Sequence, residues 1–198
     1  MSSQPLSKRV VLADFLSHTF ISQAILVLGY AAFIGLSAQI VIRLPFTPVP
    51  LTGQTFAVLV GAMVLGSKRA MAGSLAYLSL GLAGVPWFAG ATGGVRALAA
   101  PSFGYILGFI LASFLVGALA EMRLDRYFLG TLGVMVVGNL GIYVLGAGWL
   151  AFVSGLGVKE AIVLGVLPFL IGDGLKALVA DIVLPTTWRV VQRFDQEH

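Results

Sequence analysis

An acidic and a basic side chain stand three residues apart in an apolar stretch near the C-terminal end of the chain. They are Asp173 and Lys176, in the run Pro168-Phe-Leu-Ile-Gly-Asp-Gly-Leu-Lys. Pro168 fits the first turn of a helix, where its missing N–H costs nothing. Three residues then span about 4.5 Å along the axis, so both side chains can point into one cavity. A carboxylate beside an ammonium group suits a urea-like or amide group, and the pair predicts a site for a small polar solute.

Other polar side chains give weaker signals. Asn139 and Tyr143 are four residues apart and share a helix face, which suits a pocket wall or a hydrogen bond between helices. We favour the second role for Asn139. Asp181 follows further along the same stretch, where it can pair with Arg189 or Lys176, and we assign it no role in binding a ligand.

The sequence offers little for covalent, metal or nucleotide chemistry. It has no cysteine and only two histidines, which excludes a disulfide scaffold and a Cys/His metal site. The run Gly61-Ala-Met-Val-Leu-Gly-Ser-Lys approaches a nucleotide-binding loop, but its last two residues are reversed and it ends an apolar stretch. Glu121 and Asp125 alternate with Arg123 and Arg126, which is typical of a solvated loop. We therefore expect no enzyme activity, no metal and no cofactor, and any energy from ATP must come from another polypeptide.

The composition places these residues in a lipid bilayer. Of the 198 residues, 59% are hydrophobic and 10% are charged, whereas a soluble domain carries about 25% charged residues. The net charge of +4 is scattered between apolar runs, so there is no basic stripe and no indication of nucleic-acid binding.

Charged residues divide the chain into segments that can each cross a bilayer, which takes about 20 helical residues. We expect an all-α membrane protein of six transmembrane helices, forming a single integral membrane domain with a six-helix bundle over residues 15–188, an N-terminal segment 1–14 and a tail 189–198. The uncharged stretches are 15–42, 44–67, 70–95, 97–120 and 127–158, and the sixth, 161–188, is interrupted by Asp173, Lys176 and Asp181.

The distribution of Lys and Arg predicts the orientation of the bundle. Threading six spans in alternation places eight of these residues on one side and three on the other. Because positive charge accumulates on the cytoplasmic side, both termini are expected in the cytoplasm. The cytoplasmic set is Lys8, Arg9, Lys68, Arg69, Arg123, Arg126, Arg189 and Arg193, and the outer set is Arg43, Arg96 and Lys159.

Two outer connectors are apolar, unlike ordinary water-facing loops. The first outer loop, residues 44–53, contains three prolines, and the second outer loop, residues 85–103, is rich in glycine and contains Trp87 and Phe88. Irregular backbone at membrane depth is tolerated where it is buried in protein or lines a cavity. We expect both loops to fold back over the outer end of the bundle as a lid. The alternative is an interfacial position, with Trp87 and Phe88 in the aromatic belt.

Small residues recur at the spacing that lets helices approach closely. The first span has Ala31-xxx-Gly35 with Ala38 beyond, and the fourth has Gly104-xxx-Gly108. Packing within the bundle is the default interpretation of each.

The charged pair also has a structural alternative. Placing an Asp or Lys at the centre of a membrane helix costs roughly 2.5–3.5 kcal/mol. An ion pair that only sets the helix register would offset part of that cost without binding anything.

Four motifs in order give the chain a family resemblance. They are Leu44-Pro-Phe-Thr-Pro-Val-Pro-Leu-Thr-Gly-Gln-Thr, Gly84-Val-Pro-Trp-Phe-Ala-Gly, Pro101-Ser-Phe-Gly-Tyr-Ile-Leu-Gly-Phe and the run that begins at Pro168. From about residue 20 to residue 184 the chain resembles the BioY family, the biotin-specific S components of energy-coupling factor (ECF) transporters. It departs from the family at Ser102-Phe103, where Thr-Gly is usual.

The resemblance implies an S-component fold with biotin bound near the outer face. It places the binding site beneath the first and third interhelical loops, which are the first and second outer loops defined above. It implies a high-affinity substrate-capture subunit in a bacterial cell (inner) membrane, working with a transmembrane coupling protein (EcfT) and two ABC ATPase subunits. It further implies that Asp173 and Lys176 take part in biotin binding, and that small residues of the first helix, here Ala31, Gly35 and Ala38, form the coupling surface.

Biotin suits such a site physically. Its ureido ring needs donors and acceptors, its thiophane ring needs an apolar or aromatic wall, and its carboxylate needs a cation. The hypothesis places Asp173 and Lys176 on the polar headgroup, Trp87 and Tyr143 as walls, and Arg96 near the carboxylate. The reverse assignment, Lys176 to the carboxylate, stays open, as does an exposed position for Arg96. The alternative functions are an S component for another vitamin and, less favoured, a membrane-embedded enzyme.

Overall fold

The computed structural model describes residues 11–16 and 19–196, with side chains as far as residue 190. Lys8, Arg9 and the rest of residues 1–10 lie outside the described residues, as do His18 and the side chain of Arg193. The orientation predicted from the charges can therefore be compared with the structure only at the remaining Lys and Arg residues.

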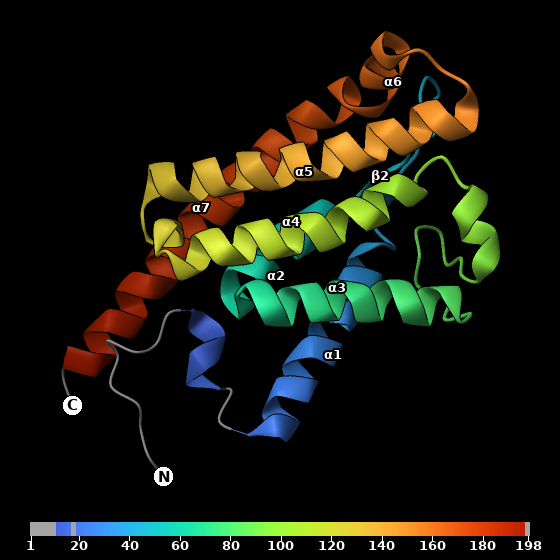
Figure 1. The fold of residues 1–198 in the computed structure, drawn as a ribbon. Helices are drawn as coiled ribbons and strands as arrows, with labels where there is room; N and C mark the ends of the chain where they lie inside the picture. Colours follow the sequence, from blue (N-terminus) through green and yellow to red (C-terminus); the bar gives the residue numbers. More distant parts are fainter. Residues whose placement is uncertain (1–10, 17–18, 197–198) are drawn as a thin grey trace.

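The described chain is a bundle of helices with a short β-hairpin at one end (Figure 1). Strands β1 and β2 pair antiparallel, with Val41 opposite Thr52. The elements in chain order are η2 (Leu12–Phe15), α1 (Phe20–Ser37), β1 (Val41–Ile42), β2 (Leu51–Thr52), α2 (Gln54–Leu65), α3 (Ser67–Leu82), η3 (Val95–Ala99), α4 (Phe103–Glu121), η4 (Leu124–Arg126), α5 (Phe128–Ser154), α6 (Val158–Gly165) and α7 (Leu167–Gln196).

The helices are unequal in length. Within the described residues, α1, α4 and α5 are each long and apolar enough to cross a membrane, and α6 with α7 forms a further candidate bent by 42°. Helix α2 is apolar but has only 12 residues, because the hairpin and its Pro-rich turn take up the start of the predicted second span.

The sixth predicted region begins near the expected residue but is divided. Pro168 is the second residue of α7, so it lies in the first turn as predicted, and Asp173 lies in the second turn. Residues 158–165 form the separate helix α6, which the charge pattern did not reveal. Helix α7 also continues through Pro185 to Gln196, so residues 189–196 of the predicted tail are helical.

Glycines let α4 and α5 lie in close contact, side by side along most of their length (Figure 1). A Cβ atom on Gly108 would stand 2.8 Å from the Cα of Ile142 and 2.9 Å from its carbonyl oxygen. A Cβ on Gly104 would overlap Trp149. The predicted packing of the Gly104-xxx-Gly108 surface within the bundle is therefore confirmed.

Replacing Gly108 with alanine should destabilise this contact. The neighbouring atoms belong to the α5 backbone, so they can move only if the helices separate, and such overpacking costs about 1–3 kcal/mol. We expect thermal unfolding of the purified protein to shift down by about 2–10 °C. Gly148→Ala in α5 is the matched control, because a Cβ there meets nothing within 4 Å. Equal melting temperatures for the two variants would contradict the close contact.

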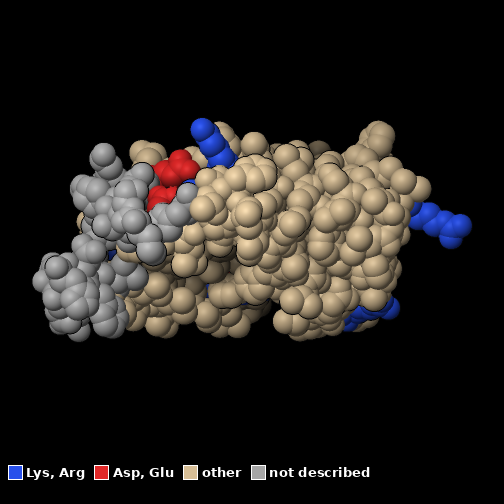
Figure 2. All heavy atoms as spheres, turned by 90° about the horizontal axis from the view of Figure 1, so that it is seen from below, with Lys and Arg blue, Asp and Glu red and all other residues tan. Residues whose placement is uncertain are grey.

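Charged residues gather toward the two ends of the bundle. On the face shown in Figure 2 they lie beside the undescribed residues and at the opposite end, and the long stretch between them is free of Lys, Arg, Asp and Glu. At the end where α7 finishes, Asp14 forms an ion pair with Arg69 at 2.9 Å. Glu121 accepts hydrogen bonds from the backbone N–H and the hydroxyl of Ser67, both at 2.8 Å, and so caps α3.

The α4–α5 connector is exposed at Glu121 and Arg123, as predicted, but not at Asp125. Asp125 is fully buried, and its Oδ2 atom accepts a hydrogen bond of 2.6 Å from the indole N–H of Trp188. The guanidinium of Arg126 lies 4.1 Å from the centre of the Trp188 ring. Alternation of acids and arginines thus predicted exposure correctly for Glu121 and Arg123 but not for Asp125, which packs beneath Trp188 of α7.

Asp125 should make stability depend on pH. Burial raises the pKa of Asp125 from 3.8, although the hydrogen bond from Trp188 and the charge of Arg126 lower it in part. Between the unfolded and folded pKa values the folded protein holds more protons, so this residue's contribution to stability falls as pH rises. Asp125→Asn keeps an acceptor for Trp188. We expect its melting temperature to exceed that of the original protein by more at pH 7 than at pH 4. A difference that is the same at both pH values would argue against this assignment.

Candidate functional site

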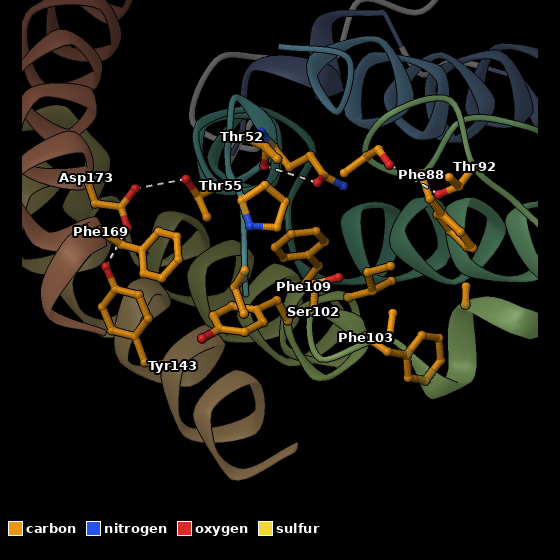
Figure 3. A pocket seen from close by; sticks show the side chains of 18 of the residues that line it. Thr52, Thr55, Phe88, Thr92, Ser102, Phe103, Phe109, Tyr143, Phe169 and Asp173 are labelled. Carbon is orange, nitrogen blue, oxygen red and sulfur yellow. Dashed lines mark hydrogen bonds between the residues drawn. The ribbon is translucent and has the colours of Figure 1, made fainter. Parts of the chain in front are cut away.

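A cavity lies at the end of the bundle that carries the β-hairpin. Its walls come from the first outer loop, α2, the second outer loop, α4, α5 and the first turns of α7, so segments far apart in the sequence meet there (Figure 3). Both predicted loops therefore fold back over the bundle, as expected from their apolar composition. The polar residues that line the cavity include Thr52, Gln54, Thr55, Tyr143, Asp173 and Lys176.

Asp173 is the centre of the polar side of the cavity. Its side chain is buried, and it accepts three hydrogen bonds. Oδ1 accepts from the Thr55 hydroxyl and from Lys176, each at 2.9 Å, and Oδ2 accepts from the Tyr143 hydroxyl at 2.5 Å. A carboxylate has about four lone-pair positions, so one acceptor position is left for a ligand N–H.

Lys176 uses its three donors within the same cluster. Its Nζ atom donates to the Thr52 carbonyl oxygen at 3.0 Å, to the Thr55 hydroxyl at 2.7 Å and to Asp173 at 2.9 Å. The side chain remains 24% exposed. Thr55 thus accepts from the ammonium and donates to the carboxylate, and it fixes the distance between them. The charges are satisfied before a ligand arrives, and a ligand can join them from the open side.

The rest of the cavity wall is largely aromatic. Phe88, Phe103 and Phe109 line it away from Asp173, and Phe169 lines it beside Asp173 (Figure 3). Tyr105 lines it as well, and its hydroxyl donates to the Gly165 carbonyl oxygen at 2.6 Å, which ties α4 to the end of α6. A few polar groups facing a largely apolar wall are typical of a small-molecule site.

The structure brings together three of the five residues predicted to bind a ligand. Asp173, Lys176 and Tyr143 share the cavity. Trp87 is not among the lining residues, because its ring packs against Tyr77 at 5.3 Å and its N–H donates to the Tyr77 carbonyl oxygen. Arg96 is exposed in η3 and is not a lining residue either.

The three small residues expected at a coupling surface lie inside the bundle. Ala31 and Ala38 are fully buried, and a Cβ atom on Gly35 would meet Trp87 at 3.0 Å. In this conformation they serve internal packing and are not accessible to a partner. Small residues permit close approach on whichever face they occupy, so their spacing could not distinguish the two cases. The outward face of α1 carries large apolar side chains instead, among them Phe20, Ile21, Ile25 and Leu36.

Sequence reasoning missed the hydroxyl and most of the aromatic groups. Thr55 follows the Pro-rich loop in the run Leu-Thr-Gly-Gln-Thr, and hydroxyls at the start of an apolar helix could have suggested it. Phe109 and Phe169 carried no signal, because a phenylalanine in an apolar span looks the same whether it faces a cavity, a helix or lipid.

Thr55→Val should weaken ligand binding without unfolding the protein. Valine has a similar shape but leaves Lys176 and Asp173 each without one hydrogen bond, and bonds to charged groups are worth about 1.5–3 kcal/mol. We expect the dissociation constant for the ligand to rise about tenfold, measured by equilibrium binding. Thr187→Val in α7 is the control, since that hydroxyl donates to the Val183 carbonyl oxygen of the same helix and Thr187 does not line the cavity. An unchanged affinity for Thr55→Val would show that Thr55 does not organise the pair.

Comparisons with known proteins agree on one family. A family profile described as the BioY family matches residues 7–193. A protein of Pyrococcus horikoshii named probable biotin transporter BioY is 40% identical over 158 residues, which covers 80% of this chain and 91% of that protein. The biotin transporter BioY of Thermotoga maritima is 37% identical over 145 residues, covering 72% and 82% of the two chains.

A solved structure has the same fold. It is described as the S-component for biotin from an ECF-type ABC transporter, and it superimposes with a TM-score of 0.77 at 25% sequence identity. The match covers 85% of this chain and 92% of that one. Together with the long apolar helices, these relatives identify a multi-pass protein of the cell membrane. With a family profile over nearly its whole length and relatives that are themselves almost fully covered, the chain belongs to the BioY family.

Proposed function

We propose that this chain is the biotin-capturing S component of an ECF-type uptake system. It binds biotin in the outer cavity and releases it inward when coupled to partner subunits. The observation that carries the proposal is the cluster of Asp173, Lys176, Thr55 and Tyr143, which faces an aromatic wall in a loop-covered cavity. The names of its relatives point to the same substrate.

The chemistry of biotin matches both sides of this cavity. One ureido N–H group can donate to the remaining acceptor position of Asp173. The ureido oxygen can accept from Lys176 by replacing one of the three acceptors that the ammonium group has in the free protein. The thiophane ring fits against the phenylalanines of the aromatic wall, where apolar contact contributes about 25 cal/mol per Å². The valeryl carboxylate then points outward.

The outer end of the bundle is suited to attract that carboxylate. Arg43, Arg96 and Lys159 belong to the outer set of charges, with Glu160 as the acidic residue beside them. A net positive rim steers an anion toward the entrance and raises its association rate at low salt. In this proposal Arg96 attracts the carboxylate from an exposed position at the entrance. Trp87 supports the second outer loop by packing against Gly35 and Tyr77.

We further propose six membrane crossings, with both termini in the cytoplasm, in a single membrane domain over residues 15–188. Helices α1 to α5 provide five, and the bent α6–α7 pair provides the sixth. Helices α2 and α3 are short for a full crossing, and the apolar loops beside them add to the length of chain that lies within the bilayer. The end that carries Arg69, Arg126 and the finish of α7 is the cytoplasmic one.

The partners of this proposal are a transmembrane coupling protein (EcfT) and two ABC ATPase subunits, which use ATP. The chain itself carries no nucleotide-binding loop in its sequence, and biotin is its cargo rather than a cofactor. Membership of the family and the likeness to an S component of an ECF-type ABC transporter support this arrangement.

Equilibrium binding of labelled biotin to the purified chain, in detergent or nanodiscs, tests the substrate. We expect saturable binding at one site that unlabelled biotin displaces and that riboflavin and thiamine do not. Binding of another vitamin with no binding of biotin would overturn the substrate and leave the S-component fold intact. ATP hydrolysis by the isolated chain would overturn the division of labour with the partner subunits.

A further inference from the structure

Part of the second outer loop closes the cavity. We call residues 87–92 the lid turn. Within it, Phe88, Ala89 and Thr92 line the cavity (Figure 3). Phe88 and Thr92 pair across the turn, with N···O distances of 2.9 Å and 3.3 Å in the two directions. The lid turn therefore forms part of the outer wall of the cavity, and its position affects how readily a ligand enters or leaves on that side.

One side chain from the end of α1 binds both arms of the lid turn. Gln39 follows the last residues of α1, and its Nε2 atom donates to the carbonyl oxygens of Trp87 at 3.2 Å and Phe88 at 3.4 Å. Its Oε1 atom accepts from the backbone N–H of Ala91 at 3.0 Å. The same Nε2 atom also donates to the Gly35 carbonyl oxygen at 2.9 Å, which fixes the side chain against its own helix.

The backbone that Gln39 holds is strained. Ala91 has φ of 56°, in the left-handed region, which is unfavourable for a residue with a Cβ atom. The hydrogen bond from its N–H to Gln39 offsets part of that cost. Without this hydrogen bond, the strain at Ala91 favours a different conformation of the turn.

An apolar contact attaches the same turn to the same helix. Trp87 packs against Gly35, where a Cβ atom would stand 3.0 Å from the indole carbon Cε3. Its indole N–H donates to the Tyr77 carbonyl oxygen of α3 at 3.0 Å. The turn is thus seated on α1 and α3, and Gln39 adds polar bonds from an exposed position at the end of α1.

We propose that Gln39 is a positioning residue that latches the lid turn over the cavity. It does not touch the ligand, and it acts by holding Phe88 and Thr92 in place. Because the latch extends from α1, movement of this helix changes the closure of the cavity. The inference rests on the proposed function, since closure matters only if the cavity binds a ligand.

The rates of biotin exchange test the latch. Gln39→Met keeps the length of the side chain and removes its hydrogen bonds, and Gln39→Glu keeps the acceptor for Ala91 but removes the donors to the two carbonyl groups. Because Gln39→Met removes the three hydrogen bonds to the lid turn, the dissociation rate of biotin should rise about tenfold for this variant. We expect the association rate to stay the same or rise. Gln23→Met, an exposed glutamine nearer the other end of α1, is the matched control and should exchange biotin like the original protein.

A labelling experiment without biotin provides a second readout. The chain has no cysteine, so Ala89→Cys gives a single thiol inside the closed turn. The reaction of this thiol with a water-soluble maleimide should be several-fold faster when Gln39→Met is present as well. Ser154→Cys, exposed at the end of α5, should react at one rate with and without Gln39→Met.

The outcomes separate the latch from the proposed function. Faster biotin release together with faster labelling of the Ala89→Cys thiol supports the latch. Biotin binding with unchanged release in both Gln39 variants would overturn it and leave the proposed function standing. If the original protein fails to bind biotin, the proposed function fails, and the labelling rates still decide whether Gln39 holds the turn.

Discussion

Asp173→Asn is expected to weaken biotin binding at least 100-fold, which corresponds to about 2.8 kcal/mol. Asparagine offers one acceptor oxygen and places an NH₂ donor toward groups that already donate. Lys176, Thr55 and Tyr143 all direct donors at the carboxylate. The substitution leaves the ammonium without its counter-charge and removes the acceptor proposed for one ureido N–H group. Hydrogen bonds to charged groups are worth about 1.5–3 kcal/mol each, so two of them account for the loss.

Asp181→Asn is the matched control for this substitution. It exchanges the same two residue types on the same helix, and Asp181 is also buried, at 2% exposure. Neither of its oxygens has a hydrogen-bond partner among the described residues, and it does not line the cavity. The pairing of Asp181 with Lys176 or Arg189 considered from the sequence is therefore not formed. We expect Asp181→Asn to bind biotin within about twofold of the original protein. Equal biotin affinities for the Asp173 and Asp181 variants would show that Asp173 does not bind the ligand.

Lys176→Met is expected to weaken biotin binding by a similar factor. A double substitution separates the loss of binding from the loss of stability. Alone, either change leaves an unpaired charge in a largely buried place, which is strongly destabilising. Asp173→Asn combined with Lys176→Met removes both charges, so we expect its melting temperature to recover most of the loss seen in the single variants. Binding should not recover, because the ligand still lacks its donor and acceptor.

The double substitution therefore distinguishes a binding pair from a purely structural one. If the pair only sets the register of α7, affinity will follow stability and return in the double variant. Melting temperature and equilibrium binding, measured on the same preparations, give the two quantities. Recovery of stability without affinity is the result that a ligand-binding role requires, and recovery of both would reject it.

The location of the charged pair could be predicted because it depends only on residues that are close together in the sequence. Asp173 and Lys176 are three residues apart on a helix that starts near Pro168, and helical geometry alone places them on neighbouring faces. Their partners belong to distant parts of the chain: Thr55 lies 118 residues before Asp173, and Tyr143 lies 30 residues before it. No spacing rule connects such positions, so the tertiary structure decides which hydroxyls complete the cluster.

The loops show the same division. Proline, glycine and low polarity were enough to predict that residues 44–53 and 85–103 fold back over the bundle. They could not predict that Phe88, rather than its neighbour Trp87, faces the cavity. That choice depends on Gly35 and Tyr77, which accept the indole ring on the other side of the turn.

The sequence by itself determined the solvent, the helical class and the intramembrane charged pair, because hydrophobicity, charge and helical periodicity act over one or two turns. Only the tertiary structure decided which face each small or aromatic residue presents. It buried Ala31, Gly35 and Ala38 inside the bundle, and it buried Asp125 beneath Trp188. Such outcomes depend on the packing of neighbours that are remote along the chain, and that information is absent from any short stretch of residues.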